Sequence, residues 1–485
     1  MLPTPQVNRM IKKRTKIVAT ISDKRCSEDF IRELHDAGMD VIRINSAHLG
    51  VDEALKIIAN ARAVSDRIAI LLDTKGPEIR TTVCDSPVTL KKGSTVRITG
   101  DPGGKTADNC IYVTYPGFAA NVGVGSSVLI DDGDLELKVM KRDGNSVECQ
   151  VQNDGILNSR KSVNIPGAKI TLPSLTDKDR AFIRMAIEQD IDFIAHSFVR
   201  SRQDVLDVQA LLTEGGSDIK IIAKIENQEG VDNIDEILES VYGIMVARGD
   251  LAIEIPYEKI PVVQRMIIGK CIHSRKAVIV ATQMLHTMIS NPRPTRAEVS
   301  DIANAIYSQT DAIMLSGETA NGKYPVEAVK TMTRVALEVE NNKEPYLEIP
   351  SGDLAVDISA YLSKVAVKTS LRIGARGIIA DTSDGRSIRA MASYRGKNII
   401  LAQCYKKRAM RELALSYGIY ATYQDEKKSM DEFIHIALKS LTSVHDLRDD
   451  DIVVVLAGNF TGGEGFSFIE VGSVSYLRDR VNIFG

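Results

Sequence analysis

The chain of 485 residues is too long for one ordinary domain, and about 150 residues per domain suggests roughly three. Apolar residues make up 44% and charged residues 26%, which excludes a largely disordered chain. Lys and Arg number 61 against 64 Asp and Glu, so the net charge of −3 favours neither nucleic acid nor a membrane surface as partner and indicates a small molecule.

The chain opens with alternating strand and helix patterns. The apolar, β-branched run KIVATI (Lys16–Ile21) predicts a strand, and the helical spacing of apolar residues from 28 to 37, before Gly38, predicts a helix. The pattern repeats at Val41–Asn45, which precedes the helical stretch DEALKIIANARAV, and a third strand is expected at Ile68–Asp73. The segment therefore contributes three strands.

Between Thr81 and about Thr171 the alternation of strand and helix patterns stops. Short alternating segments such as SVLIDDGDLELKVM are separated by Gly-rich and Asp-Gly turns, with no long helical period. The sequence predicts an inserted all-β domain here.

Strands and helices alternate again from Asp177, beginning with the helix FIRMAIEQ. Five strands follow: DFIAHSF, KIIAKIE, GIMVARGD, AVIVATQ and DAIMLSGE. With the first three they make eight, which favours a closed (β/α)8 TIM barrel over an open sheet of five or six strands. In such a barrel the active site lies at the carboxyl ends of the strands.

The polar stretch Asn341–Asp353 reads as a domain boundary. The strands GIIAD, NIILA, IYATY and DIVVVLAG then alternate with helices, too few to close a second barrel. We therefore expect an α/β protein: a TIM barrel formed by residues 1–80 and 172–345, an inserted β-barrel lid domain at 81–171, and a C-terminal α/β effector-binding domain at 350–485.

The six cysteines are scattered without a CxxC pair, so we expect reduced thiols. No stretch approaches the roughly 20 apolar residues of a membrane-spanning helix, and the first ten residues lack the apolar run of a secretory signal. A cytoplasmic protein is the default expectation.

Charged residues close two neighbouring strands. Lys224 and Glu226 end KIIAKIE two residues apart and so share one side of the strand, and Asp250 follows the next strand. Two carboxylates form a partial oxygen shell that suits Mg²⁺ or Mn²⁺, which take further ligands from water and substrate phosphate. The lysine places positive charge where a phosphoryl group develops negative charge. The alternative is a structural salt bridge at the barrel rim.

Other strand ends carry polar groups, each of which alone is equally consistent with a turn or a helix cap. They are Arg43, Asn45, Asp73, Thr74, Ser197 and Thr282. Arg80 and Lys161 flank the insertion, either on the hinge of a lid that excludes water or as ordinary surface charge.

The third domain contains a candidate phosphate cradle. The strand GIIAD runs into TSDGRS, Thr382–Ser387, where hydroxyls and free backbone N–H groups stand before a helix. A plain helix cap is the alternative. The Gly-rich loop Ala457–Phe466 either closes over the same place or forms a tight hairpin.

Several long motifs in this sequence resemble those of the pyruvate kinase family. They are LLDTKGPEIRT, KIENQEG, GIMVARGDLAIEIP, ATQML, NPRPTRAE and DAIMLSGETA, in this order from Leu71 to Ala320. The likeness extends over essentially the whole chain. It implies a glycolytic phosphotransferase that moves the phosphoryl group of phosphoenolpyruvate to ADP, giving pyruvate and ATP.

The resemblance also implies roles for single residues. Lys224 balances charge on the transferred group, and Glu226 and Asp250 hold Mg²⁺ or Mn²⁺. The expected substrate-binding residues are Arg43, Lys224, Ala247, Arg248, Gly249, Asp250 and Thr282, of which Lys224, Thr282 and Arg43 are expected to be catalytic. The expected nucleotide-binding residues are Asn45, His48, Arg80 and Lys161.

Potassium use is expected with one departure. Asn45, Asp73 and Thr74 match the potassium ligands of the family, with Ser197 near the ion, but Ala47 stands where a serine ligand is usual. Glu78, typical of potassium-dependent members, still predicts potassium use with weaker affinity. A second departure, TISD in place of the common TIGP, falls in the first barrel loop.

TSDGRS resembles the effector loop of allosterically activated members. The expected effector-binding residues are Thr382, Ser383, Asp384, Gly385, Arg386 and Ser387. The C-terminal Gly-rich loop lacks the usual TN pair, so fructose 1,6-bisphosphate, another sugar phosphate and a nucleotide stay open. The family is normally a homotetramer, which is expected here.

Two other functions are consistent with the same residues. A metal-dependent lyase or aldolase acting on pyruvate or phosphoenolpyruvate would also use Glu226 and Asp250, but would need no nucleotide. A catalytically inactive sensor would keep only the effector loop. The presence of Lys224, Glu226, Asp250 and Thr282 speaks against the sensor.

Overall fold

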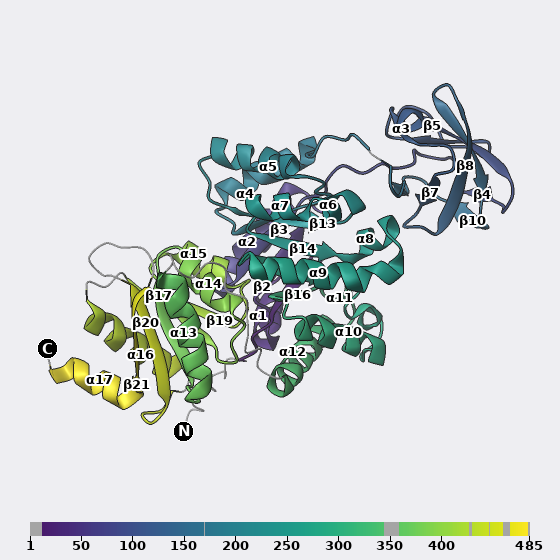
Figure 1. Ribbon diagram of the computed structural model, residues 1–485. Coiled ribbons are helices and arrows are strands. Elements are labelled where there is room, and N and C mark those ends of the chain that lie inside the picture. The colour runs from purple at the N-terminus through teal and green to yellow at the C-terminus, as the bar shows by residue number, and fades with distance from the viewer. Residues whose placement is uncertain are drawn as a thin grey trace.

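The computed structural model describes residues 12–168, 170–343, 358–425, 429–445, 447–458 and 466–483. Eight parallel strands close into a barrel at the centre of the molecule (Figure 1), in the order β1-β16-β15-β14-β13-β12-β3-β2. They are β1 Lys16–Ile21, β2 Val41–Asn45, β3 Ala69–Asp73, β12 Phe193–His196, β13 Lys220–Ile225, β14 Gly243–Ala247, β15 Ala277–Ala281 and β16 Ala312–Leu315. The barrel expected from eight strand patterns is confirmed.

Helices surround the barrel because the strands are apolar on both faces. They are α1 Glu28–Ala37, α2 Val51–Val64, α4 Asp177–Glu188, α5 Arg202–Glu214, α6 Gln228–Asp232, α7 Ile234–Ser240, α8 Arg248–Glu254, α9 Ile260–His273, α10 Arg296–Tyr307, α11 Gly317–Ala320 and α12 Pro325–Asn342, with short 3₁₀ turns at Tyr257–Lys259 and His286–Ile289. Outward side chains such as Ile42 and Ile244 pack under these helices, and inward ones such as Val41 and Met245 fill the barrel. Local alternation thus determines which residues reach the barrel interior.

Between β3 and α4 the chain forms a separate β domain, joined to the barrel by two segments (Figure 1). Its strands are β4 Val88–Leu90, β5 Thr95–Gly100, β6 Cys110–Val113, β7 Ser127–Ile130, β8 Leu135–Asp143, β9 Ser146–Val151, β10 Gly155–Leu157 and β11 Val163–Asn164, with one short helix, α3 Phe118–Asn121. Six of these strands pair in the order β11-β7-β8-β9-β5-β6. Its own apolar core, which includes Ile98 and Leu137, makes it a distinct unit.

The C-terminal domain is an α/β layer around a five-stranded sheet of order β19-β18-β17-β20-β21. Its elements are α13 Ile358–Arg372, β17 Gly377–Thr382, α14 Arg386–Ser393, β18 Ile400–Cys404, α15 Lys407–Leu413, β19 Ile419–Tyr423, α16 Met430–His445, β20 Ile452–Gly458, β21 Phe466–Ser473 and α17 Val474–Ile483. The sequence predicted four strands and missed β21, which pairs antiparallel with β20. Residues 459–465 of the Gly-rich loop lie outside the described residues, but the strands on either side of the loop form a hairpin.

This domain packs against the amino ends of the barrel strands, on the side opposite the β domain (Figure 1). Arg395 donates to both carboxylate oxygens of Asp311, at 2.7 and 2.6 Å, just before β16. Leu415 is fully buried in the same apolar cluster as Val18 and Leu71 inside the barrel. The carboxyl ends of the strands are thereby left to the β domain.

No helix among the described residues is long and apolar enough to cross a membrane. All six cysteines are free thiols, as expected.

Candidate active site

A lysine lies between two carboxylates at the carboxyl end of the barrel. Lys224 Nζ, on β13, lies 2.9 Å from Glu226 Oε1 and 3.1 Å from Asp73 Oδ1, and donates to Ser197 Oγ at 2.7 Å. Burial works to lower the pKa of Lys224, but Asp73 and Glu226 raise it above its usual value. The Lys224 ammonium is therefore buried and positively charged, and it contacts Asp73, Glu226 and Ser197 from one position.

Arg43 joins this cluster from β2. Its Nε donates to Asp73 Oδ2 at 2.6 Å, and its Nη1 donates to Thr20 Oγ1 at 3.0 Å. Burial works to raise the pKa of Asp73, but Arg43 and Lys224 hold it below its usual value. Asp73 is thus an ionised anchor that orients two cations.

Glu226 and Asp250 are the carboxylates without a full set of cationic partners. Burial raises the pKa of Glu226 to about 7, and the charge of Asp250 adds to the rise. Burial also raises the pKa of Asp250. Glu226 Oε2 accepts from the backbone N–H of Phe198 at 2.6 Å, whereas its buried Oε1 has no partner with hydrogen-bond geometry. Lys224 thus offsets only part of the negative charge of these two carboxyl groups, of which Glu226 is fully buried.

Such a donor set fits a divalent cation. Hard carboxylate oxygens suit Mg²⁺ or Mn²⁺, and a doubly charged ion would favour the ionised form that burial disfavours in both groups. Within the described residues, no group of three or more His, Cys, Asp and Glu side chains is placed to hold a metal. Glu226 and Asp250 thus supply a partial shell, which leaves ligand positions for substrate and water.

The loop after β15 brings Thr282 to the start of α8. Thr282 Oγ1 accepts from the backbone N–H of Gly249 at 2.8 Å, and both Thr282 and Gln283 have positive φ, 71° and 56°. The Arg248 guanidinium donates to the carbonyls of Ala281 and Thr282, at 3.2 and 2.6 Å, and pairs with Asp301. The Arg248 side chain therefore stabilises the Thr282 loop, and only the Arg248 backbone remains to contact substrate.

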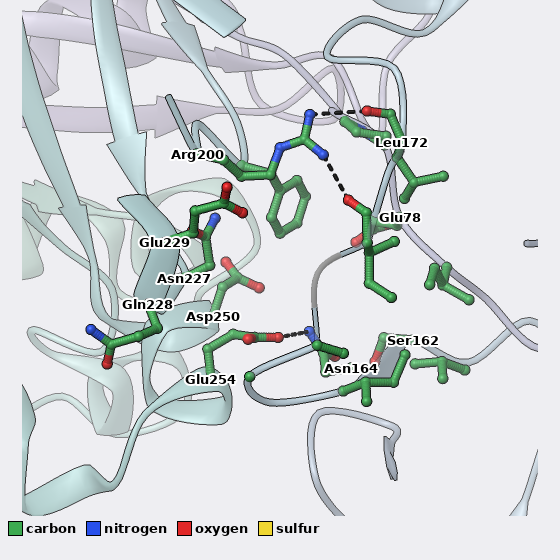
Figure 2. A pocket seen from close by; sticks show the side chains of 18 of the residues that line it. Glu78, Ser162, Asn164, Leu172, Arg200, Asn227, Gln228, Glu229, Asp250 and Glu254 are labelled. Atoms are coloured by element: carbon green, nitrogen blue, oxygen red, sulfur yellow. Dashed lines mark hydrogen bonds between the residues drawn. The ribbon is translucent and has the colours of Figure 1, made fainter. Parts of the chain in front are cut away.

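A cavity of 370 Å³ opens between the barrel and the β domain (Figure 2). Asp250 and Glu254 line it from the barrel, and Glu254 accepts from the Asn164 amide of the β domain at 3.4 Å. Arg200 donates to the carbonyls of Ile170 and Leu172, both at 2.9 Å, where the chain returns from the β domain. The cavity is thus lined by Asp250, a candidate metal ligand, and by residues of the two segments that join the β domain to the barrel.

The residues expected to bind nucleotide come from both the barrel and the side of the β domain. Arg80 Nη2 pairs with Glu78 at 2.8 Å, and Lys161 Nζ with Asp131 at 2.8 Å, both on the side of the β domain. Asn45 Oδ1 accepts from the backbone N–H of Ala47 at 3.1 Å. His48 is exposed next to them. None of the four is among the residues that line the cavity next to Asp250.

The potassium-ligand candidates lie beside the lysine cluster. Thr74 Oγ1 accepts from the backbone N–H of Ser197 at 3.0 Å, and Ser197 Oγ donates to the Thr74 carbonyl at 2.6 Å. Asp73 and Thr74 are both buried. Asn45, the last residue of β2, lies opposite Asp73 in the pairing of β2 with β3.

The TSDGRS segment adopts a tight turn before α14. Thr382 Oγ1 accepts from the N–H of Gly385 at 2.8 Å, and Asp384 Oδ1 from that of Arg386 at 2.8 Å. Gly385 has φ 79°, and Ser383 and Asp384 are exposed. The N–H groups of Gly385 and Arg386 are thus occupied within the turn, and Thr382 is buried.

The sequence missed two residues that organise this site. Phe198 has a φ of 55°, which is rare for a bulky side chain, and that conformation directs its N–H to Glu226. Arg200 holds the return segment of the β domain. A phenylalanine at positive φ has no sequence signal, and the partners of Arg200 lie 28 and 30 residues away.

Comparisons with known proteins agree with this geometry. A family model described as pyruvate kinase, barrel domain, matches residues 12–329, and a second, pyruvate kinase, alpha/beta domain, matches residues 361–471. A pyruvate kinase from Borreliella burgdorferi is 47% identical over 96% of this chain and 98% of its own, and one from Geobacillus stearothermophilus is 43% identical over 97% and 81%.

Three-dimensional similarity is equally extensive. The crystal structure of a pyruvate kinase from Cryptosporidium parvum superposes with a TM-score of 0.91 at 35% identity, covering 97% of this chain and 98% of that one. Sequence and fold therefore agree over nearly the full length, and this chain belongs to the pyruvate kinase family.

Proposed function

We propose that this protein transfers the phosphoryl group of phosphoenolpyruvate to ADP, giving pyruvate and ATP in the last step of glycolysis. The observation that carries the proposal is the buried Lys224 ammonium between Asp73 and Glu226, in a chain of the pyruvate kinase family. Phosphoryl transfer needs little covalent help from protein and much positioning and charge stabilisation, which this cluster supplies.

The residues act in sequence. The P–O bond of phosphoenolpyruvate breaks as an oxygen of the ADP β-phosphate takes the phosphoryl group, and Lys224 and Arg43 offset the charge that spreads over its oxygens. Backbone N–H groups from Ala247 to Gly249 receive the substrate carboxylate, the Gly249 N–H in exchange for its bond to Thr282 Oγ1. Thr282, with a bound water, delivers a proton to the terminal carbon of the enolate, because a threonine hydroxyl alone is too weak an acid.

Glu226 and Asp250 would hold Mg²⁺ or Mn²⁺ beside Lys224. When bound, the ion supplies positive charge to phosphate and enolate oxygens. The support is Glu226 Oε1, which pairs with Lys224 but accepts no hydrogen bond within the described residues, and the raised pKa of both carboxyl groups.

Potassium use is proposed at Asn45, Asp73 and Thr74, with weakened affinity because Ala47 offers no side-chain oxygen. The buried oxygens of Asp73 and Thr74 near Ser197 support the proposal. A titration with KCl against a large inert cation tests it: activity should rise with potassium, and rates indifferent to potassium would remove the site.

Arg80, Lys161, His48 and Asn45 are proposed to bind the nucleotide phosphates, with the β domain acting as a lid. The ion pairs of Arg80 and Lys161 are partly exposed, so they contribute little and can be exchanged for phosphate.

The turn at 382–387 is proposed as an effector site for a sugar phosphate or a nucleotide. Binding assays with each candidate against a Thr382→Glu variant test this, and an unaltered activation curve in the variant would place the effector elsewhere. We further propose a cytoplasmic homotetramer; exposed Tyr257 and Val262, 81% and 70% accessible, are apolar surface available for assembly. The division at 1–80, 81–171, 172–345 and 350–485 belongs to the same proposal.

The lyase or aldolase alternative is not favoured by the family assignment. A coupled assay of pyruvate release separates the two reactions. Release should require ADP and yield ATP; pyruvate formed at the same rate without ADP would contradict phosphoryl transfer, and a protein without turnover would be the inactive sensor.

A further inference from the structure

A second cavity, of 200 Å³, lies where the segment leading into β1 meets the C-terminal domain. Four cationic residues line it: Lys12 and Arg14 from that segment, and Arg376 and Lys397 from the C-terminal domain. We call it the basic cavity. It is unrelated to the cluster around Lys224, which lies at the other end of the barrel strands.

The basic cavity is also distinct from the turn at 382–387. Arg376 immediately precedes β17 and Lys397 shortly precedes β18, so the cavity lies at the amino ends of these two parallel strands. The turn follows the carboxyl end of β17, which is about 20 Å away along a six-residue strand. A ligand at one place therefore cannot contact the other.

The charge of the basic cavity is positive because no Asp or Glu is among its lining residues. Arg14 is compensated by Glu340, at 3.5 Å, but Arg376 Nε lies 3.9 Å from Asp451, at the limit of an ion pair. Lys397 is exposed and forms no ion pair with any residue that the structure describes. The cavity thus retains cationic groups for an anion.

Asn398 gives an independent indication. It lines the cavity, and its buried Nδ2 has no hydrogen-bond partner within the described ranges. A buried donor without an acceptor is destabilising, so such groups point to a ligand or an ordered water. An anionic oxygen would satisfy it with a charge-assisted bond.

The rest of the lining is apolar. Ile399, Leu401 and Leu447 form it, with Leu401 and Leu447 only 1% and 5% exposed. Because Leu401 and Leu447 are almost completely covered already, the half-buried Ile399 is the apolar residue that a small organic body would cover and a bare inorganic ion would leave exposed.

We propose that the basic cavity binds a small organic phosphate, with its phosphate on the basic side chains and Asn398 and its apolar body against Ile399. Such a ligand joins the segment before β1 to the C-terminal sheet. The site is independent of phosphoryl transfer at Lys224, so its presence or absence leaves that function unaffected.

Calorimetric titration of the full-length protein with phenyl phosphate, at fixed ionic strength, tests the proposal. We expect saturable binding to the native protein, and an affinity at least about tenfold weaker in the double variant Arg376→Gln/Lys397→Gln, because two charge-assisted contacts are lost. Both side chains are accessible, so the variant should keep its native melting temperature and turnover.

Two controls sharpen the result. Lys439→Gln removes an exposed lysine of α16 that does not line the cavity, and Arg386→Gln removes a cation of the turn at 382–387; neither should lower the affinity. Absence of saturable binding, or equal affinity in native protein and double variant, would overturn the proposal. Inorganic phosphate should bind more weakly, and equal affinity for it would overturn the apolar subsite.

Discussion

At the residue scale, the active site depends on charged side chains that hold one another in position. Asp73 holds Arg43 and Lys224 at once, and Lys224 reaches Glu226 and Ser197 from the same atom. A buried network of this kind is stable only when every member is satisfied. Glu226 Oε1 pairs with the Lys224 ammonium at 2.9 Å but accepts no hydrogen bond within the described residues, which is why we propose the divalent ion there.

Replacing Lys224 with methionine should separate chemistry from metal binding. Without the ammonium we expect turnover to fall by about 10²–10³-fold, the range for loss of one charge-stabilising group. Mn²⁺ binding, followed by electron paramagnetic resonance, should persist because Glu226 and Asp250 remain. Near-normal turnover would show that Lys224 does not stabilise the transferred group.

Gly76 tests the role of Phe198. A Cβ at Gly76 would lie 2.7 Å from Phe198 Cδ2 and 2.8 Å from Ser197 Cβ, so Gly76→Ala should displace the N–H that holds Glu226. We expect kcat to fall about tenfold, of the order of a 1.4 kcal/mol loss.

Gly93→Ala is the matched control for this substitution. Gly93 has the same backbone strain, φ 86° against 70°, but nothing lies within 4 Å of the new Cβ. Gly93→Ala should lose about 1–2 kcal/mol of stability from the left-handed backbone alone, Gly76→Ala should lose more because of the clash, and only Gly76→Ala should lose activity. Equal kinetics in the two variants would mean that the clash does not reach Glu226.

At the element scale, the loop between β12 and α5 forms hydrogen bonds with the segment that returns from the β domain to the barrel. Arg200 in this loop is itself fixed by Asp204, at 2.9 Å, and holds the carbonyls of Ile170 and Leu172. Because these carbonyls belong to the return segment, the loop determines where the β domain lies above the site.

Arg200→Gln should therefore change catalysis rather than barrel stability. We expect a several-fold higher KM for ADP and faster proteolytic cleavage near residues 170–172, because the return segment loses two hydrogen bonds of about 1 kcal/mol each. Arg202→Gln, whose exposed ion pair with Glu239 spans 3.6 Å, is the control and should behave as the native protein. An unchanged KM in Arg200→Gln would exclude this role.

At the scale of the whole molecule, the C-terminal domain closes the amino end of the barrel. Asp311 accepts from Arg395 through both oxygens and from the Tyr417 N–H at 3.0 Å, and Leu415 enters the barrel cluster. The two domains thus share one buried polar and apolar junction.

Two aspartates at this junction allow a matched comparison. Asp311→Asn leaves the buried Arg395 without its counterion and should cost about 3–5 kcal/mol, seen as a lower unfolding midpoint in urea. Asp66→Asn removes an exposed pair with Lys407, 57% and 55% accessible, and should cost less than about 1 kcal/mol. Equal shifts in the two variants would show that burial does not govern this junction.

The sequence by itself determined the eight barrel strands and the placement of Lys224, Glu226 and Asp250 at their ends. These features are local: a period of two places Lys224 and Glu226 on one side of a strand, and apolar runs mark the strands. The family motifs are likewise written in contiguous residues from Leu71 to Ala320.

Only the tertiary structure decided the positive φ of Phe198, the hydrogen bond from Arg200 to the return segment of the β domain, the antiparallel β21 and the insertion of Leu415 into the barrel. Each depends on groups brought together by packing from distant parts of the chain, such as Arg395 and Asp311, which are 84 residues apart. Local propensity carries no information about such partners, because their energy exists only once the domains have met.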